Sequence, residues 1–293
     1  MDPSNNEIHK AYNIQLFRGW AEPGKHVWSP FVIKLEARLR FAGVNYTVQA
    51  GSPQTAPKGK IPYIEIHGQL PSHLAGSGYD AGRDGWSIRA DPNGSPIASL
   101  GDSTLIIKAL RKQGLLPSLN DRLDPEQRSH DMALQALLED KLYFYHTKER
   151  WVNNYYVMRD HALWSIPYPI RILVGLLVLR KQTAMLHGQG TGRFSDEELK
   201  TFKFEIWRSI DGLLKASKGK QYSETGASTP FWVFGGDTPT EADATLFGFI
   251  VSVLASTAGP ESREIVQSLP TVVEYARRIH NRFFPDYDEW DEK

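Results

Sequence analysis

The hydrophobic pattern of this 293-residue chain changes once, near residue 115, and this change constrains the fold more than any other feature. Before it, short apolar runs typical of strands alternate with segments of helical spacing. After it, apolar residues recur only at the spacing of helices. We therefore predict an α/β domain over residues 1–114, a linker over 115–124 and an all-helical domain over 125–293.

The α/β part begins with a strand–helix–strand unit. Strands are expected over 13–17 and 44–48, and a helix is expected between them over 30–41. Ser29 stands at the N-cap of this helix and Pro30 in its first turn, where both residue types are favoured. Two strands joined through a helix pair in parallel, with a right-handed crossover.

The remainder of the α/β part supplies two more strands and one more helix. Strands are expected over 61–66 and 96–100, and a helix is expected to open at Asp102 and run to about residue 112. Residues 68–96 are dense in Gly, Ser, Asp and Pro, and turn signals of this kind predict a long insertion between strands.

The second part of the chain shows helical periodicity throughout. Helices are predicted over 125–150, 152–164, 170–182, 195–215, 241–256 and 269–281. Pro167 and Pro169 are expected to interrupt the pattern before the third of these helices. Thr240 and Asp243 form a capping box, which we interpret as a folding signal without a catalytic role. The Gly-rich segment 186–193 lacks the Gly-Lys-Ser/Thr ending of a phosphate loop, so it is predicted to connect two helices.

Composition excludes several classes of function. The chain contains no cysteine, which rules out disulfide frameworks, zinc-thiolate sites, iron–sulfur clusters and a cysteine nucleophile. Lys and Arg number 34 and Asp and Glu number 34, so the formal net charge is zero. A domain that binds nucleic acid through its phosphates is usually strongly basic, so no nucleic-acid partner is expected.

No targeting or membrane-spanning segment is expected. The first ten residues are polar and lack the apolar stretch of a signal peptide. The most apolar run, residues 170–179, is about half the roughly 20 residues that a spanning helix needs. We therefore expect a cytoplasmic protein without a membrane span.

Several short motifs occur in an order that resembles one family. A strand precedes Ser29-Pro30-Phe31, Gly59-Lys60-Ile61-Pro62-Tyr63 enters a later strand, and Asp102-Ser103 caps a helix. This order resembles the glutathione-binding, thioredoxin-like domain of glutathione transferases. The segments 186–193 and 234–244 resemble the failed-axon-connections (Fax) and metaxin-related branch of that superfamily, which has many fungal members. The resemblance implies a thioredoxin-like N-terminal domain, an all-α C-terminal domain and a fungal member of the branch.

The resemblance also implies a binding site for glutathione as cofactor. Ile61-Pro62 is a cis peptide in such domains, and its backbone pairs with the cysteinyl part of glutathione; otherwise Pro62 would simply begin an edge strand. Asp102 and Ser103, at a helix N-terminus, would hold the γ-glutamyl carboxylate, or would form a plain N-cap. Lys60, and less surely Lys58, would meet the glycyl carboxylate, unless these are ordinary solvated lysines.

Ser29 is the residue that the resemblance implies for activating glutathione. It stands where related families place the hydroxyl or thiol that stabilises the glutathione thiolate, and the helix N-terminus would add electrostatic help. The same serine is also a suitable structural N-cap. The alternatives for activation are Lys25, His26 and Trp28 in the preceding loop, and Tyr12 at the first strand.

One departure from the Fax pattern narrows the chemistry. Those proteins usually carry a cysteine three residues after the serine, whereas this chain has Val32. Without a cysteine the protein cannot form a mixed disulfide with glutathione, so thiol transfer is disfavoured. Glutathione itself is then expected to be the nucleophile.

We expect the second substrate, an apolar electrophile or a polyene, to bind between the domains. The aromatic residues of the candidate region are Trp86, Tyr143, Tyr145, Trp151, Tyr155, Tyr156, Trp164 and Tyr168. The expected reaction is addition of the thiolate to an electrophilic carbon. A sharper variant is reversible addition to a conjugated double bond, which would make the protein a trans/cis isomerase of fungal polyketide metabolism.

A non-catalytic binding or scaffold protein is the alternative, because the Fax and metaxin branch includes members with such roles. The acidic tail after Asn281 contains no apolar anchor, which disfavours membrane recruitment of the metaxin kind. Superfamily resemblance implies a homodimer, and no metal site is expected.

Overall fold

A computed structural model of the protein describes residues 13–68, 70, 85–221 and 229–290. A five-stranded sheet forms the first layer, with the strand order β2-β1-β3-β5-β4. The strands are β1 (Asn13–Phe17), β2 (Thr47–Gln49), β3 (Tyr63–His67), β4 (Ser87–Ala90) and β5 (Pro96–Gly101). β1 and β2 are parallel, as predicted, and the other neighbouring pairs are antiparallel.

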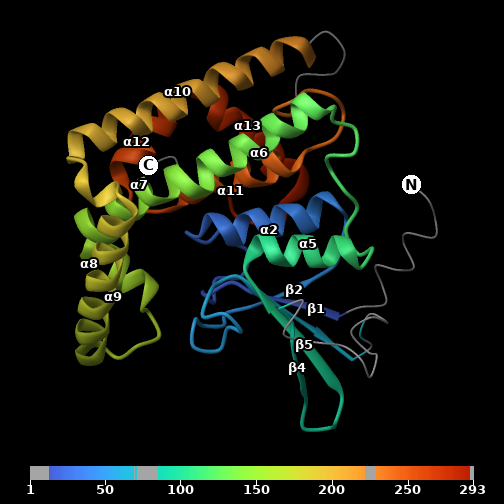
Figure 1. Ribbon diagram of the computed structural model, residues 1–293, viewed down its shortest axis with the longest axis vertical. Coiled ribbons are helices and arrows are strands. Elements are labelled where there is room, and N and C mark those ends of the chain that lie inside the picture. The colour runs from blue at the N-terminus through green and yellow to red at the C-terminus, as the bar shows by residue number, and fades with distance from the viewer. Residues whose placement is uncertain (1–12, 69, 71–84, 222–228, 291–293) are drawn as a thin grey trace.

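Two helices cover one face of this sheet and separate it from the helical part (Figure 1). They are α2 (Pro30–Phe41) and α5 (Ser103–Lys112), and both match the predicted ranges. Ile14, Leu16 and Ile64 of the sheet join Leu35 of α2 in one apolar core. Because α2 packs on the sheet through this core, the first turn of the helix has a fixed position.

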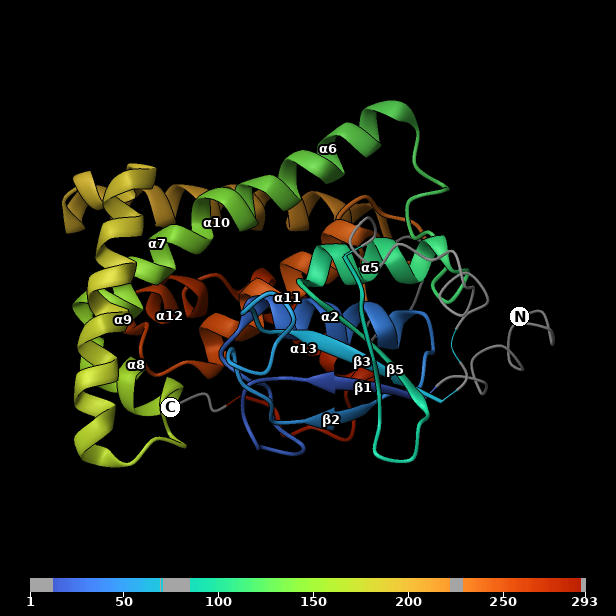
Figure 2. The same ribbon diagram turned by 60° about the horizontal axis from the view of Figure 1, so that its bottom comes forward.

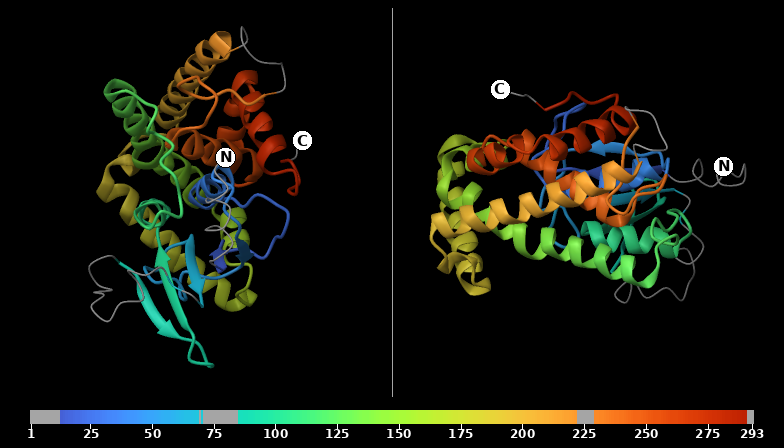
Figure 3. Two further views of the ribbon diagram at one scale, coloured as in Figure 1. Left: turned by 90° about the vertical axis from the view of Figure 1, so that its right-hand side faces the viewer. Right: turned by 90° about the horizontal axis from the view of Figure 1, so that it is seen from above.

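The sheet contains one strand that was not predicted, and the strand expected over 44–48 is observed over Thr47–Gln49. β4 lies inside the segment expected to be an insertion and forms a hairpin with β5 around the turn at residues 91–95. All four β4 residues are exposed, so this edge strand has no apolar alternation that could predict it. The hairpin extends away from the body of the molecule (Figure 3). Residues 69 and 71–84 of the expected insertion lie outside the described residues.

The helical part packs above α2 and α5 (Figure 2). Its helical segments are α6 (Pro125–Ala136), η1 (Leu137–Leu142), α7 (Tyr143–Lys148), η2 (Glu149–Asn153), α8 (Tyr155–Ala162), α9 (Tyr168–Gln189), η3 (Thr191–Arg193), α10 (Asp196–Gln221), α11 (Glu241–Ala255), α12 (Pro260–Gln267) and α13 (Pro270–Phe283). The predicted α/β and all-helical arrangement is therefore confirmed.

Two predictions about α9 and its surroundings are wrong. Pro169 does not interrupt the helix but lies in its first turn, where a missing amide proton costs nothing. The helix continues to Gln189, so the predicted connection at 186–193 is mostly the end of α9 and the short turn η3. Gly190, at φ 105°, ends α9 in the left-handed conformation. α12 was not predicted.

α11 crosses α2 at very short range. A methyl group placed on Gly248 would lie 2.6 Å from the carbonyl oxygen of Pro30 and 2.9 Å from the amide nitrogen of Lys34. Only glycine allows two helix backbones to approach this closely. This contact joins the start of α2 directly to the core of the helical part.

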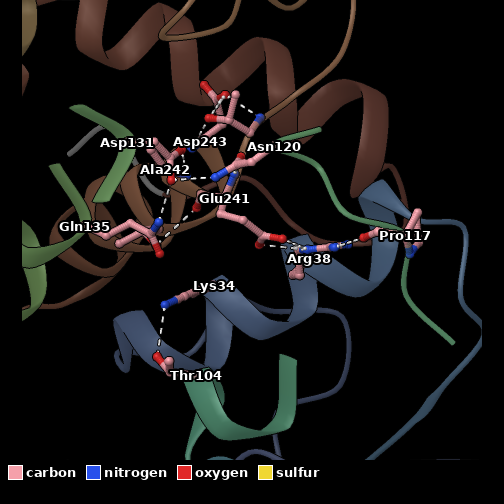
Figure 4. A network of polar contacts seen from close by, with 12 residues as sticks. Lys34, Arg38, Thr104, Pro117, Asn120, Asp131, Gln135, Glu241, Ala242 and Asp243 are labelled. Atoms are coloured by element: carbon pink, nitrogen blue, oxygen red, sulfur yellow. Dashed lines mark hydrogen bonds and ion pairs between the residues drawn. The ribbon is translucent and has the colours of Figure 1, made fainter. Parts of the chain in front are cut away.

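A polar network joins the two parts at the other end of α2 (Figure 4). Arg38 Nε donates to both carboxylate oxygens of Glu241, at 3.0 and 2.8 Å. Asn120, in the predicted linker, accepts from the Glu241 amide at 3.0 Å and donates to Asp131 at 2.8 Å. The segment between the two parts is therefore tied to both α6 and α11.

No single helix among residues 13–68, 85–221 and 229–290 is both long and apolar enough to cross a membrane. The pair α11 and α12 reaches the required hydropathy only together, and it is bent by 117°.

Candidate functional site

Two cavities adjoin at the N-terminal end of α2. The larger has a volume of about 490 Å³ and is lined by Phe31, Gly59, Lys60, Ile61, Pro62, Asp102, Ser103, Thr104, Glu139, Tyr143, Phe144, Gln182 and Met185. The smaller has a volume of about 160 Å³ and is lined by Trp20, Trp28, Ser29, Pro30, Phe31, Ile61, Tyr143, His146, Thr147, Arg150, Trp151 and Met158. Phe31, Ile61 and Tyr143 line both cavities, so the two are neighbours.

The larger cavity brings together the five residues predicted to bind a cofactor: Lys60, Ile61, Pro62, Asp102 and Ser103. The Ile61–Pro62 peptide is cis, as expected. The carbonyl oxygen of Pro62 accepts a hydrogen bond from the Asp102 amide at 3.1 Å. This bond connects the start of β3 to the start of α5, and thereby holds the two halves of the predicted binding set in register.

Asp102 has an unusual backbone conformation. Its φ is +83°, and no other described non-glycine residue has a positive φ. Its Oδ1 accepts from the amides of Thr104 and Leu105 at 3.1 and 3.3 Å. Asp102 is therefore the N-cap of α5, and these two amides are not available to a ligand. The amide and hydroxyl of Ser103 have no hydrogen-bond partner in the part of the chain that the structure describes.

The two candidate lysines differ in position. Lys60 is 66% exposed, and its Nζ lies 3.4 Å from Oδ2 of Asp102 at the rim of the larger cavity. Lys58 does not line the cavity, and its ammonium group lies beside Gly85 instead. Only Lys60 is therefore placed to meet a ligand carboxylate here.

The wall of the larger cavity also contains an ion pair that the sequence pattern did not reveal. Lys34, on a buried side of α2, pairs with Glu139 of η1 and donates to Thr104 of α5 at 3.3 Å. Glu139 and Thr104 both line the cavity. Helical periodicity predicts that Lys34 faces solvent, and only the packing of η1 against α2 reveals its partner.

Ser29 lines the smaller cavity and has a free hydroxyl. Its backbone has N-cap geometry, with φ −86° and ψ 118°, but its side chain makes no capping hydrogen bond. The hydroxyl also has no other partner among the residues described. A purely structural N-cap role therefore explains the backbone conformation of Ser29, but it gives the hydroxyl no hydrogen bond.

The peptide group before Ser29 is held from the helical part. Arg150 Nη1 and Ser252 Oγ both donate to the carbonyl oxygen of Trp28, at 2.8 and 2.6 Å. Burial lowers the pKa of Arg150 to about 10, so its guanidinium remains positive at neutral pH. The Trp28 ring stacks on His161 at 3.4 Å between centroids, which fixes the loop from a second side.

His146 adds a neutral polar group to the smaller cavity. Its side chain is 4% exposed, and its Nε2 has no hydrogen-bond partner among the described residues. Burial, followed by the charges of Arg150 and Lys203, lowers the pKa of His146 well below its usual value. Sequence reasoning missed both His146 and Arg150, because each looks like any polar residue on a long helix.

The alternatives to Ser29 lie elsewhere. His26 is buried, and its Nε2 lies 2.9 Å from Nδ1 of His280, away from both cavities. Lys25 lines neither cavity, and Trp28 lines the smaller cavity but carries no hydroxyl or thiol. Tyr12 lies outside the described residues.

The aromatic wall differs in part from the predicted one. Of the predicted residues, Tyr143 and Trp151 line the smaller cavity, together with Trp20, Trp28 and Phe31. The others lie in the core or on the outer surface: Trp86, Tyr145 and Tyr155 are buried, and Tyr156, Trp164 and Tyr168 are exposed. Aromatic spacing alone cannot distinguish a cavity wall from a core, because both are apolar.

Comparison with family models identifies the chain's relatives. Residues 30–79 and 90–157 match the model described as "Glutathione S-transferase N-terminal domain". Residues 229–279 match the model described as "Glutathione S-transferase, C-terminal domain". The chain belongs to the glutathione transferase superfamily.

Within this superfamily the chain is similar to Failed axon connections from Drosophila melanogaster. The two are 24% identical over 277 residues, which cover 89% of this chain and 56% of that protein. The chain thus spans little more than half the length of this relative. The predicted likeness to the Fax branch is confirmed, whereas the expected fungal origin is not supported.

Two solved structures show the same transferase fold. Glutathione transferase GSTFuA3 from Phanerochaete chrysosporium has a TM-score of 0.51 and 17% identity, over 95% of this chain and 98% of that chain. FzlA from C. crescentus has a TM-score of 0.50 and 11% identity, over 94% of this chain and 91% of that chain. At these identities the likeness concerns the fold alone.

Proposed function

We propose that this protein is a glutathione transferase-like enzyme that binds glutathione in the larger cavity and activates its thiol at Ser29. The observation that carries the proposal is the unpartnered hydroxyl of Ser29, next to the cavity that contains the predicted binding residues. Its volume, about 490 Å³, lies within the range of about 300–1,000 Å³ typical of small-molecule sites. Membership of the superfamily supports glutathione as the ligand.

The polar groups of the larger cavity suit the two ends of glutathione. Ser103 offers an amide and a hydroxyl for the γ-glutamyl carboxylate, and Oδ2 of Asp102 would accept from the γ-glutamyl ammonium group. Lys60, which lies 3.4 Å from this oxygen without a ligand and is 66% exposed, would turn away from Asp102 to meet the glycyl carboxylate. The backbone of Ile61 and Pro62 would pair with the cysteinyl part in between.

The thiol would then extend into the smaller cavity. The hydroxyl of Ser29 donates to the thiolate, and the N-terminus of α2 and the charge of Arg150 lower the energy of the anion further. The thiol proton passes to solvent. The sulfur forms a bond to an electrophilic carbon, from which either a leaving group departs or the π electrons move to the neighbouring atom and are protonated.

The smaller cavity limits the second substrate. About 160 Å³ is too small to enclose a drug-sized ligand, so we propose an electrophile of which only the reacting, conjugated end is enclosed. Aromatic walls suit such a planar group, and Nε2 of His146 is available to it as a hydrogen-bonding group. Reversible addition, with expulsion of the thiolate after bond rotation, is the isomerase variant of this proposal.

Calorimetry and kinetics of Ser29→Ala test the proposal. The variant should bind glutathione nearly as well as the wild type, because Ser29 does not line the larger cavity. Its kcat/KM with a conjugated model electrophile should fall about 10- to 100-fold, the effect of losing a hydrogen bond to a charged group. The pH–rate profile should also move to higher pH, because the thiolate loses a donor.

Ser209→Ala, on the exposed side of α10, is the matched control and should leave rate and pH profile unchanged. Absence of glutathione binding to the wild type at millimolar concentration would overturn the proposal. An unchanged rate in Ser29→Ala would move activation to another residue. Stoichiometric consumption of glutathione would support conjugation and rule out the isomerase variant.

A non-catalytic binding protein is the second candidate, and similarity to Failed axon connections favours it. Glutathione binding without turnover of any electrophile would support this candidate.

We also propose, on superfamily resemblance, that the protein is a cytoplasmic homodimer. Light scattering coupled to size-exclusion chromatography measures that oligomeric state directly.

A further inference from the structure

The outer surface of α8 and α9 concentrates the large apolar side chains that the described part of the protein exposes to water. Nine of the fourteen exposed large apolar residues fall in residues 155–189. They are Tyr156, Val157, Trp164, Tyr168, Ile170, Leu173, Leu176, Leu177 and Met185. Single exposed apolar residues are ordinary, but a contiguous group of them marks a surface that binds something.

Because α8 packs against one side of α9, the apolar residues on the opposite side of α9 form a stripe that faces solvent. A methyl group on Gly175 would lie 2.6 Å from the Tyr155 hydroxyl and 2.7 Å from Cδ of Arg159, so this side of α9 is pressed against α8. Ile170, Leu173 and Leu177 follow a spacing of three and four residues on the opposite side. They are 54%, 65% and 69% exposed. Figures 1 and 2 show α8 and α9 at the edge of the molecule.

The same surface exposes two positive charges. Of the four cationic residues in 155–189, Arg159 is buried and pairs with Asp160, and Arg171 lies 3.8 Å from the same carboxylate, whereas Arg180 and Lys181 are exposed. These two exposed residues lie about one turn beyond Leu177. Neither forms an ion pair with a described residue.

Aromatic side chains gather where α8 packs against α9. The Arg159 guanidinium lies 5.4 Å from the ring of Tyr156 and 5.8 Å from that of Tyr168, and the three form one cluster. Trp164 is exposed in the connection between the two helices. Tyrosine and tryptophan beside apolar and cationic side chains are typical of surfaces at a lipid–water boundary.

We propose that the outer face of α9, with Arg180 and Lys181, binds peripherally to an anionic membrane surface. Apolar side chains enter the headgroup boundary while the cations meet lipid phosphates and carboxylates. A second copy of the chain is a poorer occupant, because pairing this face with itself would bring Arg180 and Lys181 of both copies to one interface. Met185 lines the larger cavity, so it is the one member of the exposed apolar group that also contacts the candidate site.

Vesicle co-sedimentation tests this proposal without depending on glutathione. The full chain should bind phosphatidylcholine vesicles that contain phosphatidylserine, and bind pure phosphatidylcholine vesicles at least about tenfold more weakly. Leu173→Asp combined with Leu177→Asp should reduce binding more than about tenfold. Arg180→Glu combined with Lys181→Glu should abolish the preference for phosphatidylserine. These side chains are exposed, so the unfolding temperature and calorimetric glutathione binding should stay unchanged.

Met132→Asp, an equally exposed apolar position on α6, is the matched control and should bind as the wild type does. Failure of the wild type to bind either vesicle would overturn the proposal, as would unchanged binding of the Leu173/Leu177 variant. A dimer that dissociates in that variant would show that the face joins two copies instead. Loss of glutathione binding alone would concern the proposed function and leave this inference intact.

Discussion

Asp102 combines two tasks at one position, and ligand binding is proposed as a third. Its left-handed backbone conformation costs about 1–3 kcal/mol in a non-glycine residue. In return, Oδ1 caps α5 and Oδ2 stands beside Lys60 at the cavity rim. A plain capping residue needs no such conformation, so the strain fits a residue whose side chain also serves a ligand.

Two substitutions separate these tasks. Asp102→Asn keeps an oxygen acceptor for the amides of Thr104 and Leu105 and tolerates a positive φ, so stability should change by less than about 0.5 kcal/mol. Glutathione affinity should fall about 10- to 100-fold, because the charged acceptor for the ammonium group is lost. Asp102→Ala should lose affinity similarly and also cost about 1 kcal/mol of stability. Calorimetry and urea denaturation measure the two effects.

Equal glutathione affinity in Asp102→Asn and the wild type would place the ammonium group elsewhere. A matching control is Asp124→Asn, which replaces the N-cap of α6 far from either cavity and should leave glutathione affinity unchanged.

At the scale of elements, α2 is the helix on which the site depends. It is enclosed so completely that Lys34, Glu36 and Arg38 are buried along with its apolar residues. Each of these charges has a partner from another part of the chain: Glu139 of η1, Tyr287 after α13 and Glu241 of α11. Buried charges without such partners would be strongly destabilising, so the pairs help to define how the two parts of the chain dock.

α11 and α2 approach each other very closely at Gly248. Gly248→Ala should destabilise the protein by about 1–3 kcal/mol, because its methyl group would overlap the Pro30 carbonyl. The displaced start of α2 should also lower the rate of the conjugation reaction. Gly212→Ala, in the exposed middle of α10, has open space and should instead be neutral or stabilising by up to about 1 kcal/mol. Urea denaturation compares them, and equal stability would contradict the close packing.

At the scale of the whole molecule, buried imidazoles link folding to pH. Burial is the largest cause that lowers the pKa of His26, His146, His161 and His280, in the case of His161 to about 4. His26 and His280 also share a hydrogen bond of 2.9 Å, in which one ring donates and the other accepts. These side chains are therefore neutral in the folded protein at neutral pH.

Stability should fall as the pH is lowered. In the unfolded chain the histidines titrate near 6.5, so below that pH the unfolded state takes up protons that the folded state does not bind. The stabilising contribution is complete above about pH 6.5 and is lost as the pH falls towards the folded-state pKa values. Each buried histidine contributes up to about 1.4 kcal/mol per pH unit. The raised pKa values of Glu36 and Asp243 oppose this trend but involve fewer groups.

Urea denaturation between pH 7 and 5 checks this expectation. In His146→Phe the free energy of unfolding should fall less steeply as the pH is lowered, by up to the contribution of one histidine. The exposed His130→Gln should leave this slope unchanged. A free energy of unfolding that does not depend on pH over this interval would contradict the expectation.

Much of the fold was predictable because its signals are local. Ser29 and Pro30 mark the start of α2, Asp102 that of α5 and Thr240 that of α11, and each signal acts within a few residues. The five residues predicted to bind glutathione also line one cavity, because they lie at the adjoining N-terminal ends of β3 and α5. They are Lys60, Ile61, Pro62, Asp102 and Ser103. Edge strand β4 was missed, since its exposed residues carry no periodic pattern.

The sequence by itself determined the order of most elements, the absence of a protein thiol and five of the residues that line the larger cavity. Only the tertiary structure decided that the Ser29 hydroxyl has no partner among the described residues, that Arg150 holds the preceding peptide and that α9 turns leucines outward. The physical reason is the separation along the sequence of the groups that interact. A cap or a turn is set by neighbours in sequence, whereas a hydrogen bond between Trp28 and Arg150, 122 residues apart, exists only once the two parts of the chain have packed.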